Sequence, residues 1–345
     1  MKAVVILRHG DLDQLVVKEM PAPRPAQGEV VIEVHAAALN HLDLWVRKGA
    51  RDFGLTFPHI LGSDAAGVVV EVGETVEELR VGDEVILDGW LCLSDDEFVR
   101  AGEHSLCASS DIVGIRHAGT FAERVSVPAR NVLPRPPYLN WEEAAALTLS
   151  HLTAWRMLMT RAALHSGETV LIHGIGGGVA LAGLQLAKLA GAEVIVTSSS
   201  DEKLARALGL GADHTINYRA TRDVAGEVRQ ITAGRGVDVV LDTVGAATLP
   251  ISQAAARRGG RIVICGVTGG AEAMLNLHGL YWNQLSLLGS TMGNLSEFRQ
   301  MLRAVSLSRI RPVIDSAYAL EEVRDATARM EAGKQFGKIV LRVRS

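Results

Sequence analysis

Hydrophobic and polar positions follow two different patterns along the chain, one before about residue 140 and one after it. In the first part, residues 28–34 alternate with a period of two, and short apolar runs at 65–73, 81–86 and 119–125 are bounded by glycine. Short alternating runs separated by turn residues predict β-strands. With few helical patterns among them, they indicate a small, antiparallel, β-rich domain.

The second pattern consists of continuous apolar runs that alternate with helical stretches. The predicted strands are residues 168–173, 193–197, 237–242 and 261–265, and the predicted helices include residues 179–190 and 201–208. Asn140 is a candidate N-cap for a helix that starts at Trp141. Strands that are apolar throughout are buried on both faces, which is typical of a parallel sheet with βαβ crossovers. From about residue 292 the chain is helical, and it then returns to a strand at 338–343.

The residues between the first two predicted elements of this second part form a glycine-rich loop, Gly174-Ile175-Gly176-Gly177-Gly178-Val179-Ala180. Glycines allow a tight turn there and let backbone N–H groups approach an anion, and the start of a helix favours negative charge. The small Ala180 lets the helix pack close to the sheet. Because the loop lies between a strand and a helix, it predicts a Rossmann dinucleotide site at Gly174, Gly177, Gly178 and Val179. The alternative is a loop whose glycines serve the turn alone.

The end of the second strand bears on which dinucleotide binds. An NAD site favours an acidic residue about 20 positions after the loop, which holds the ribose 2′-hydroxyl. Here the strand ends in Ser198-Ser199-Ser200, and the next carboxylate, Asp201, begins a helix. A neutral Ser198 with Lys203 one turn into that helix suits a 2′-phosphate, so NADP(H) is favoured over NAD(H). A solvated surface lysine at 203 is the alternative.

Composition narrows the remaining classes of function. The chain has 345 residues, 48% of them hydrophobic, and a net charge of −4 without any basic run, so we expect no nucleic-acid partner. The length favours two domains. An odd set of three cysteines fits a reducing compartment. The apolar run at residues 3–7 is too short for a membrane span, so we expect a cytoplasmic protein without a membrane partner.

Several motifs resemble one family along nearly the whole chain. They are Gly28–Val34, Asn40-His41-Leu42-Asp43, Gly62-Ser63-Asp64-Ala65-Ala66-Gly67, Val81-Gly82-Asp83, Gly119–Glu123 and Gly333–Lys338. Together they are similar to the medium-chain dehydrogenase/reductase superfamily, which contains the zinc alcohol dehydrogenases and the quinone oxidoreductases. The resemblance implies an α/β fold in which a doubly wound Rossmann sheet, residues 151–291, is inserted into a GroES-like catalytic domain. Residues 1–150 would form that catalytic domain, and residues 292–345 would complete it.

The resemblance also implies roles for single residues. Thr153 matches a threonine beside the nicotinamide, and His41 and Lys338 match positions that contact the pyrophosphate. Lys203 and Tyr218 match the pair that holds the adenosine 2′-phosphate in quinone oxidoreductases. It further implies a homodimer or higher homo-oligomer, formed through residues 285–290. Independently of the family, Cys265 ends a parallel strand at the ligand-facing edge, where it either lines the nicotinamide pocket or only packs.

The family's zinc ligands are not present at the matching positions. A catalytic zinc needs three nitrogen, sulfur or carboxylate ligands and one open position. The matching residues are Asn40, Ser63 and Leu149, with Asp64 at the neighbouring acidic position, so we expect no zinc there. In the structural zinc lobe, which uses four cysteines, only Cys107 matches a ligand position, and Cys92 is displaced by one residue. An alternative site would combine Cys92 and Cys107 with His104 and Asp95.

Without zinc, a simple alcohol or aldehyde is a difficult substrate, because the metal stabilises the alkoxide. Quinones and α,β-unsaturated carbonyls delocalise the charge that hydride transfer creates, so positioning and hydrogen bonding suffice. The working hypothesis is therefore an oxidoreductase for such small molecules. In it, Asn40 donates to the developing oxyanion and Trp45 forms a flat apolar wall, although both residues could be purely structural. The alternatives are an alcohol dehydrogenase of the zinc type and a nonenzymatic NADPH-binding protein.

Overall fold

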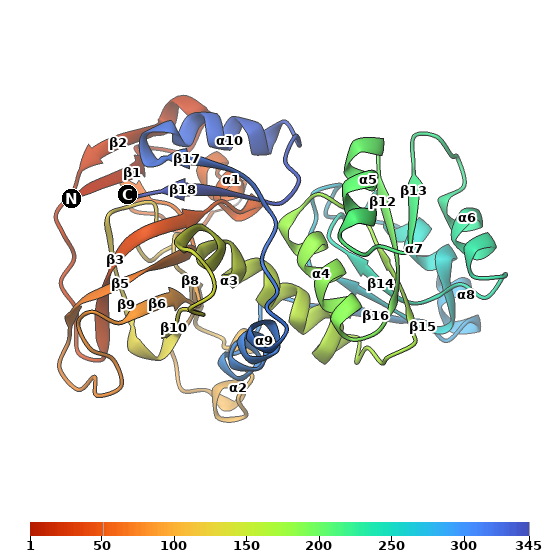
Figure 1. The fold of residues 1–345 in the computed structure, drawn as a ribbon, viewed down its shortest axis with the longest axis horizontal. Helices are drawn as coiled ribbons and strands as arrows, with labels where there is room; N and C mark the ends of the chain where they lie inside the picture. The colour runs from red at the N-terminus through yellow and green to blue at the C-terminus, as the bar shows by residue number, and fades with distance from the viewer. Residues whose placement is uncertain (51, 345) are drawn as a thin grey trace. The chain divides into compact units, whose positions relative to one another are not determined.

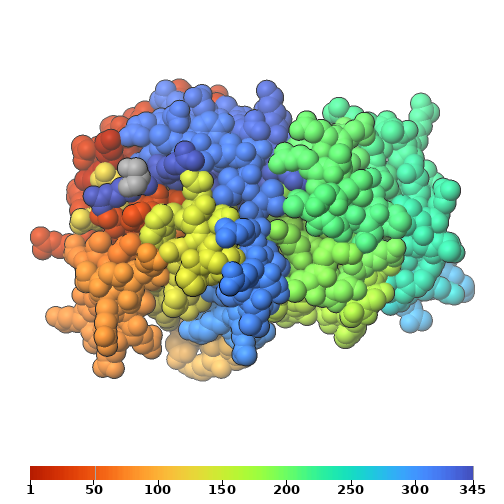
Figure 2. Space-filling model, viewed as in Figure 1, coloured from red at the N-terminus to blue at the C-terminus, as the bar shows by residue number. Residues whose placement is uncertain are grey.

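The computed structural model describes residues 1–50 and 52–344, which form two compact units (Figure 1). The first unit combines Met1–Leu149 with Gly293–Ser345, and the second is Ser150–Met292. Both chain ends therefore belong to one unit. In Figure 2 the blue surface of the C-terminal segment adjoins the red surface of the N-terminal strands within that unit.

The first unit is built on a seven-stranded sheet. Its strand order is β10-β6-β5-β3-β18-β17, and β9 also pairs with β3. The strands are β3 (Glu29–Ala38), β5 (Asp64–Val72), β6 (Glu84–Leu87), β9 (Arg124–Pro128), β10 (Val132–Pro134), β17 (Ile314–Ala319) and β18 (Lys338–Arg342). The predicted antiparallel pairing is confirmed except at one edge, where β17 and β18 are parallel. The reason is that helix α10 (Val323–Glu331) connects these two strands as a crossover.

The rest of the first unit surrounds this sheet. A second sheet consists of β1 (Lys2–Ile6), β2 (Leu15–Glu19) and β4 (His59–Ile60), and β7 (Trp90–Cys92) pairs with β8 (Ser110–Ile112). The helices are α1 (His41–Lys48), α2 (Glu97–Arg100), the N-terminal part of α3 (Trp141–Trp155) and α9 (Leu295–Leu307). The predicted cap of α3 is present, because Asn140 Oδ1 accepts the Glu143 N–H at 2.8 Å and Glu143 accepts the Asn140 N–H at 3.0 Å.

The second unit is a doubly wound parallel sheet with strand order β13-β12-β11-β14-β15-β16. The strands are β11 (Thr169–Ile172), β12 (Glu193–Ser198), β13 (His214–Asn217), β14 (Val237–Asp242), β15 (Ala256–Ile264) and β16 (Ser286–Gly289). The helices are α4 (Gly178–Leu189), α5 (Asp201–Gly209), α6 (Val224–Ile231), α7 (Leu249–Ala255) and α8 (Leu277–Trp282). Every residue of β11 and β14 is buried, so the expectation drawn from their continuous apolar runs is confirmed.

Two elements of this sheet differ from the sequence prediction. Strand β15 begins at Ala256, five positions before the predicted start, because its polar first half pairs with β14 through a shifted register between Val237 and Val239. The prediction omits strand β13, because its four residues are half polar and give no clear strand pattern. Its pairing with β12 stabilises it as a strand. No helix among the described residues is both long enough and apolar enough to cross a membrane.

Candidate active site and cofactor loop

A buried charge pair lies in the first unit where three strands meet. Asp64 is the first residue of β5 and Lys338 the first of β18, and both strands flank the end of β3. The Lys338 ammonium donates to Asp64 Oδ2 at 2.9 Å, to Asn40 Oδ1 at 2.6 Å and to the Leu39 carbonyl at 2.8 Å. Asp64 has no exposed surface and Lys338 is 5% exposed. A pair this deep is stable only when further hydrogen bonds satisfy both charges.

Those further hydrogen bonds come from the α3 helix and from Asn40. Thr148 Oγ1 donates to Asp64 Oδ1 at 2.5 Å, and the Leu149 N–H donates to the same oxygen at 2.9 Å. Asn40 Nδ2 donates to Asp64 Oδ2 at 2.9 Å and makes a longer bond of 3.4 Å to the Ala38 carbonyl. We call Asn40, Asp64, Thr148 and Lys338 the buried charge network.

A second carboxyl supports the same corner of the unit. Asp43 caps the start of α1 by accepting the Asn40 N–H at 2.7 Å, and its other oxygen accepts the Gly62 N–H at 3.2 Å. Burial raises the pKa of Asp43 to about 7, although these two hydrogen bonds and the charge of Lys338 oppose that shift. Asp43 therefore positions the chain on both sides of the network, which is the structural role that its place in the motif suggests.

In the second unit, the glycine loop presents backbone donors at the start of α4. Gly177 is the N-cap of this 12-residue helix, and no side chain caps it. Gly174 adopts a left-handed conformation, with φ of 67°, as the tight turn requires. The loop is held to the neighbouring strand by the Ile175 N–H, which donates to the Thr197 carbonyl at 2.9 Å. A Cβ built on Gly177 meets nothing within 4 Å, so open space lies in front of the helix start. This geometry suits a pyrophosphate.

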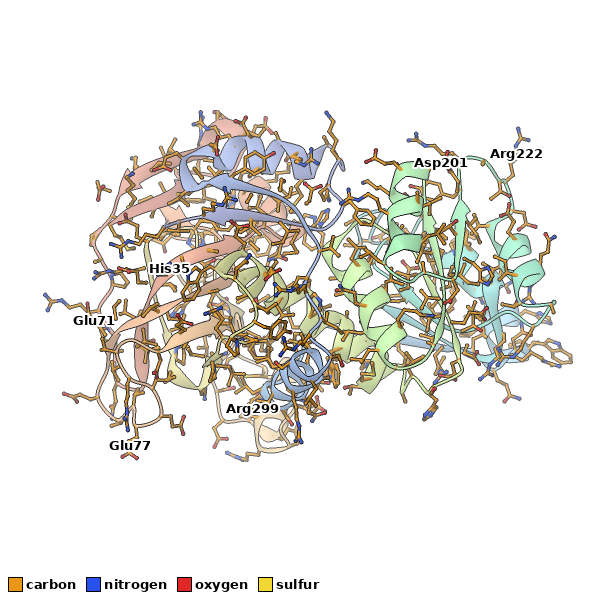
Figure 3. The ribbon with its side chains drawn as sticks, in the orientation of Figure 1. His35, Glu71, Glu77, Asp201, Arg222 and Arg299 are labelled. Carbon is orange, nitrogen blue, oxygen red and sulfur yellow. The ribbon has the colours of Figure 1, made fainter. Side chains whose placement is uncertain are left out.

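The predicted phosphate-binding residues gather at the same edge of this sheet. Ser198 ends β12, and the Tyr218 N–H donates to its carbonyl at 3.1 Å. Lys203 lies in the first turn of α5, and its N–H donates to the N-cap Ser200 Oγ at 3.3 Å. Asp201, labelled in Figure 3, accepts from Asn217 Nδ2 at 2.7 Å, so the first available carboxylate is already paired. The arrangement places Lys203 in the helix turn that closely follows the strand ending at Ser198.

Two further side chains, His173 and Asp242, lie at the carboxyl ends of the central strands. His173 follows β11, its Nδ1 lies 3.2 Å from Thr197 Oγ1, and its Nε2 is buried without a hydrogen-bond partner among the described residues. Burial lowers the pKa of His173, which keeps it neutral. Asp242 accepts from two backbone N–H groups and from the hydroxyls of Thr248 and Ser252. The sequence analysis assigned no role to His173 or Asp242, and their positions at strand ends are the signal that could have found them.

Comparisons with known proteins cover both units. Residues 26–137 match the family model of the alcohol dehydrogenase GroES-like domain, and residues 178–306 match that of zinc-binding dehydrogenases. The NAD-dependent alcohol dehydrogenase of Sulfolobus acidocaldarius is 33% identical over 99% of this chain and 100% of its own length. The chain belongs to the medium-chain dehydrogenase/reductase superfamily. It is therefore an oxidoreductase of a family that uses nicotinamide cofactors, as the motifs indicated.

Other members of the superfamily carry different names. The crotonyl-CoA carboxylase/reductase of Cereibacter sphaeroides is 31% identical over 94% of this chain and 82% of its own length. The chain in a crystal structure of an NAD-dependent alcohol dehydrogenase is 42% identical in sequence to this chain. The superposition covers 100% of both chains and has a TM-score of 0.96. The predicted combination of a GroES-like domain and an inserted Rossmann sheet is confirmed by these matches and by the two sheets.

Zinc is the metal that membership of this superfamily suggests, and the residues present do not fit it. Asn40 and Leu149 face Asp64 through their amide groups, and Ser63 Oγ donates to the Val113 carbonyl at 2.7 Å. Within residues 1–50 and 52–344, no group of three or more His, Cys, Asp or Glu side chains could hold a metal ion. The combination of Cys92 and Cys107 with His104 and Asp95 is likewise not assembled, and Asp95 instead pairs with Arg100 at 3.2 Å.

The structure adds detail to the other predicted residues. His41 begins α1, and burial together with the nearby Lys338 charge lowers its pKa. Trp45 is partly buried and packs against the hydrophobic core of the first unit. In the second unit, Thr153 Oγ1 lies 3.8 Å from the Met292 sulfur. Burial and the charge of Asp242 raise the pKa of Cys265 to about 12, so this thiol is un-ionised.

The observed contacts differ most from the roles predicted from the sequence at Lys338 and Asn40. All three protons of the Lys338 ammonium are used by Asp64, Asn40 and the Leu39 carbonyl, so contact with a pyrophosphate requires the ammonium to give up one of these bonds. For Asn40, only the 3.4 Å bond to the Ala38 carbonyl is weak enough to exchange for a substrate. Thr148, which the sequence analysis did not consider, completes the network, and its place next to Leu149 was the available signal.

Proposed function

We propose that this protein transfers hydride from a nicotinamide dinucleotide to a quinone or an α,β-unsaturated carbonyl without a zinc ion. The buried charge network carries the proposal. Lys338 neutralises Asp64 at the position where zinc relatives place an acidic residue beside their metal, and Asn40 and Leu149 contribute amides instead of ligands. The charges of Asp64 and Lys338 are therefore satisfied by protein groups, both side chains and backbone.

The chemistry of a conjugated acceptor matches such a site. Hydride added to an enone or a quinone produces an enolate or a hydroquinone, whose negative charge is spread over several atoms. When the dinucleotide is bound, it supplies the hydride. Asn40 Nδ2 exchanges its long bond to Ala38 for one to the substrate oxygen while its bond to Asp64 keeps it oriented. The partly buried Trp45 forms the apolar wall against which the acceptor lies.

For the cofactor, we propose NADP(H) in preference to NAD(H). Ser198, Lys203 and Tyr218 lie at the ends of neighbouring strands or in the adjoining helix turn, and the carboxylate of Asp201 is already hydrogen-bonded to Asn217. The remaining predicted contacts, Thr153 and His41, and the glycine loop itself serve the nicotinamide and pyrophosphate ends. Replacing Lys203 with Met is expected to raise the KM for NADPH about tenfold and to leave the KM for NADH unchanged.

An alcohol dehydrogenase activity is the second candidate, because several relatives that span nearly the whole chain bear that name. In such a reaction a simple alkoxide must be stabilised, and the site offers only Asn40 for this purpose. The alcohol dehydrogenase reaction therefore needs a strong electrophile such as zinc to stabilise the alkoxide, whereas the reduction of a conjugated acceptor needs it much less.

The second unit also supports a homodimer. Strand β16 is the last strand of its sheet, and helix α8, which precedes it in the chain, carries exposed apolar residues: Leu277 is 66% exposed, Tyr281 65% and Trp282 60%. An edge strand with apolar residues beside it is a pairing surface. Light scattering at several concentrations is expected to give the mass of a dimer, and a monomer at all concentrations would contradict this.

The function is tested by measuring NADPH and NADH oxidation with a panel of quinones, enones and saturated aldehydes, with and without a chelator. The proposal expects kcat/KM for the conjugated acceptors to exceed that for the matching saturated aldehydes by about 100-fold or more, with no effect of the chelator. Higher activity on saturated aldehydes that the chelator abolishes would establish the alcohol dehydrogenase instead. Nicotinamide binding without turnover of any acceptor would leave the nonenzymatic alternative.

A further inference from the structure

The first unit contains a pair of thiols that the proposed function does not use. Cys92 ends β7, and Cys107 follows the short helical turn His104–Leu106 that precedes β8. The two thiols lie close enough for each to influence the pKa of the other. Ser94 joins both of them, because its hydroxyl lies 3.3 Å from Cys107 Sγ and its carbonyl accepts from Cys92 Sγ at 3.7 Å. We call Cys92, Ser94 and Cys107 the thiol cluster.

The thiol cluster lies just below the surface. Cys92 and Cys107 are each 4% exposed, whereas their neighbours Leu93 and Leu106 are 55% and 52% exposed. Each buried thiol is therefore adjacent in sequence to a side chain at the surface. The backbone holds the pair in place, since the Leu93 N–H donates to the Ser109 carbonyl at 3.3 Å and the two strands pair at Cys92 and Ser110.

Metal binding does not account for the pair. Zinc sites built from protein side chains need three or four ligands. In the described part of the chain, no third His, Cys, Asp or Glu joins Cys92 and Cys107. Two thiols in contact, without further ligands, are instead the arrangement of a dithiol that can close to a disulfide.

We propose that Cys92 and Cys107 are a modification site that hydrogen peroxide converts reversibly to an intramolecular disulfide. The Cys107 thiolate attacks one peroxide oxygen, the O–O bond breaks, and a sulfenic acid and one water form after protonation. The Cys92 sulfur then attacks the Cys107 sulfur. The S–S bond forms, the S–O bond breaks, and the second water leaves with the Cys92 proton. Two thiols are oxidised by two electrons, and one peroxide is reduced to two waters.

The surroundings of the two sulfur atoms indicate which cysteine attacks the peroxide and which one then closes the disulfide. The pKa of Cys107 is lowered to about 7, because hydrogen bonds from Cys92 and Ser94 to its sulfur outweigh the desolvation that opposes them. Burial and the neighbouring Cys107 raise the pKa of Cys92 to about 11. Cys107 is thus the thiol that is ionised near neutral pH, and Cys92 is the resolving thiol.

The test treats the full-length protein with hydrogen peroxide, alkylates the remaining thiols and maps the peptides by mass spectrometry. The expected result is a cross-linked peptide pair containing Cys92 and Cys107, lighter than the reduced pair by about 2 Da, which dithiothreitol reverses. The Cys265→Ser variant, as the matched control, is expected to form the same cross-link. A wild-type protein in which both cysteines stay alkylatable, or in which Cys107 accumulates as sulfinic acid without any cross-link, would overturn the proposal.

A second measurement separates chemistry from folding. In Cys92→Ser the resolving thiol is missing, so Cys107 is expected to remain a sulfenic acid that dimedone traps and to reach sulfinic acid at least about tenfold faster than in the wild type. Circular dichroism of the untreated variant checks that it folds. Equal rates of sulfinic acid formation in a folded Cys92→Ser variant and the wild type would contradict the assigned resolving role.

Discussion

The two units differ in the groups that interact with charge: side chains in the first unit and, as we propose, backbone N–H groups in the second. In the first unit, the buried charge network is made of side chains that come from four distant parts of the chain, with Lys338 and Asp64 as its ion pair. In the second unit, the anion site that we propose consists of backbone N–H groups in one short loop, where Gly177 leaves open space. A side-chain site depends on the fold around it, whereas a backbone site depends on the absence of side chains. The two sites should therefore fail differently when they are mutated.

The largest effect is expected for Lys338→Met, which leaves Asp64 buried without its counter-ion. Breaking a buried pair in this way costs about 3–5 kcal/mol in the free energy of unfolding. Urea unfolding measures it, and the exposed Lys334→Met variant four positions earlier is the control. Similar stability of the two variants would show that the pair contributes little. The double variant Asp64→Asn/Lys338→Met should recover part of the loss, because no buried charge remains.

The opposite behaviour is expected for Gly177→Val. The φ of Gly177 is −76°, which any residue adopts, and its Cβ direction is empty, so the stability of the protein should change little. The side chain would instead occupy the space for the pyrophosphate and weaken NADPH binding by about 100-fold, or roughly 2.7 kcal/mol. Isothermal titration calorimetry measures the affinity. Gly209→Ala, at a helical glycine that also has open space, is the control that should leave the affinity unchanged.

Asn40→Ala tests whether the network touches the reaction. We expect kcat for an enone to fall about tenfold while the Kd for NADPH changes less than about twofold, because the amide acts on the substrate oxygen. Steady-state kinetics and direct binding measurements separate the two quantities. Unchanged turnover in a folded variant would leave Asn40 only its bonds to Asp64 and Lys338.

The smallest effect concerns the pH dependence of stability. Burial raises the pKa of Asp88 to about 7, above its value in the unfolded chain, so the native state binds the extra proton. Stability is then lost as pH rises from about 4 to about 7 and stays flat above that range. Asp88→Asn, which cannot ionise, should therefore lose less stability than the wild type between about pH 5 and about pH 8. Asp52→Asn, an exposed carboxyl that also accepts one backbone N–H, should show no such difference, and equal slopes would refute the assignment.

The same contrast explains what could be predicted from the sequence. The glycine loop, its strand and its helix are contiguous, so their pattern alone predicted the turn between β11 and α4, and its binding role stays a prediction. The absence of zinc ligands at Asn40, Ser63 and Leu149 was also readable, because the family motifs fix those positions. The burial of Lys338 was not readable, since it arises only when β18 pairs with β3 beside β5. Strand β13 was missed for a related reason, namely that its order comes from its neighbour β12.

The most direct test of the metal-free account is the metal content of the active protein. The purified enzyme should contain less than about 0.1 zinc per chain by elemental analysis, and it should keep its full rate of enone reduction after prolonged dialysis against a chelator. About one zinc per chain that dialysis removes together with the activity would contradict the account. In that case the Asp64–Lys338 pair could not be what satisfies the charge of this site.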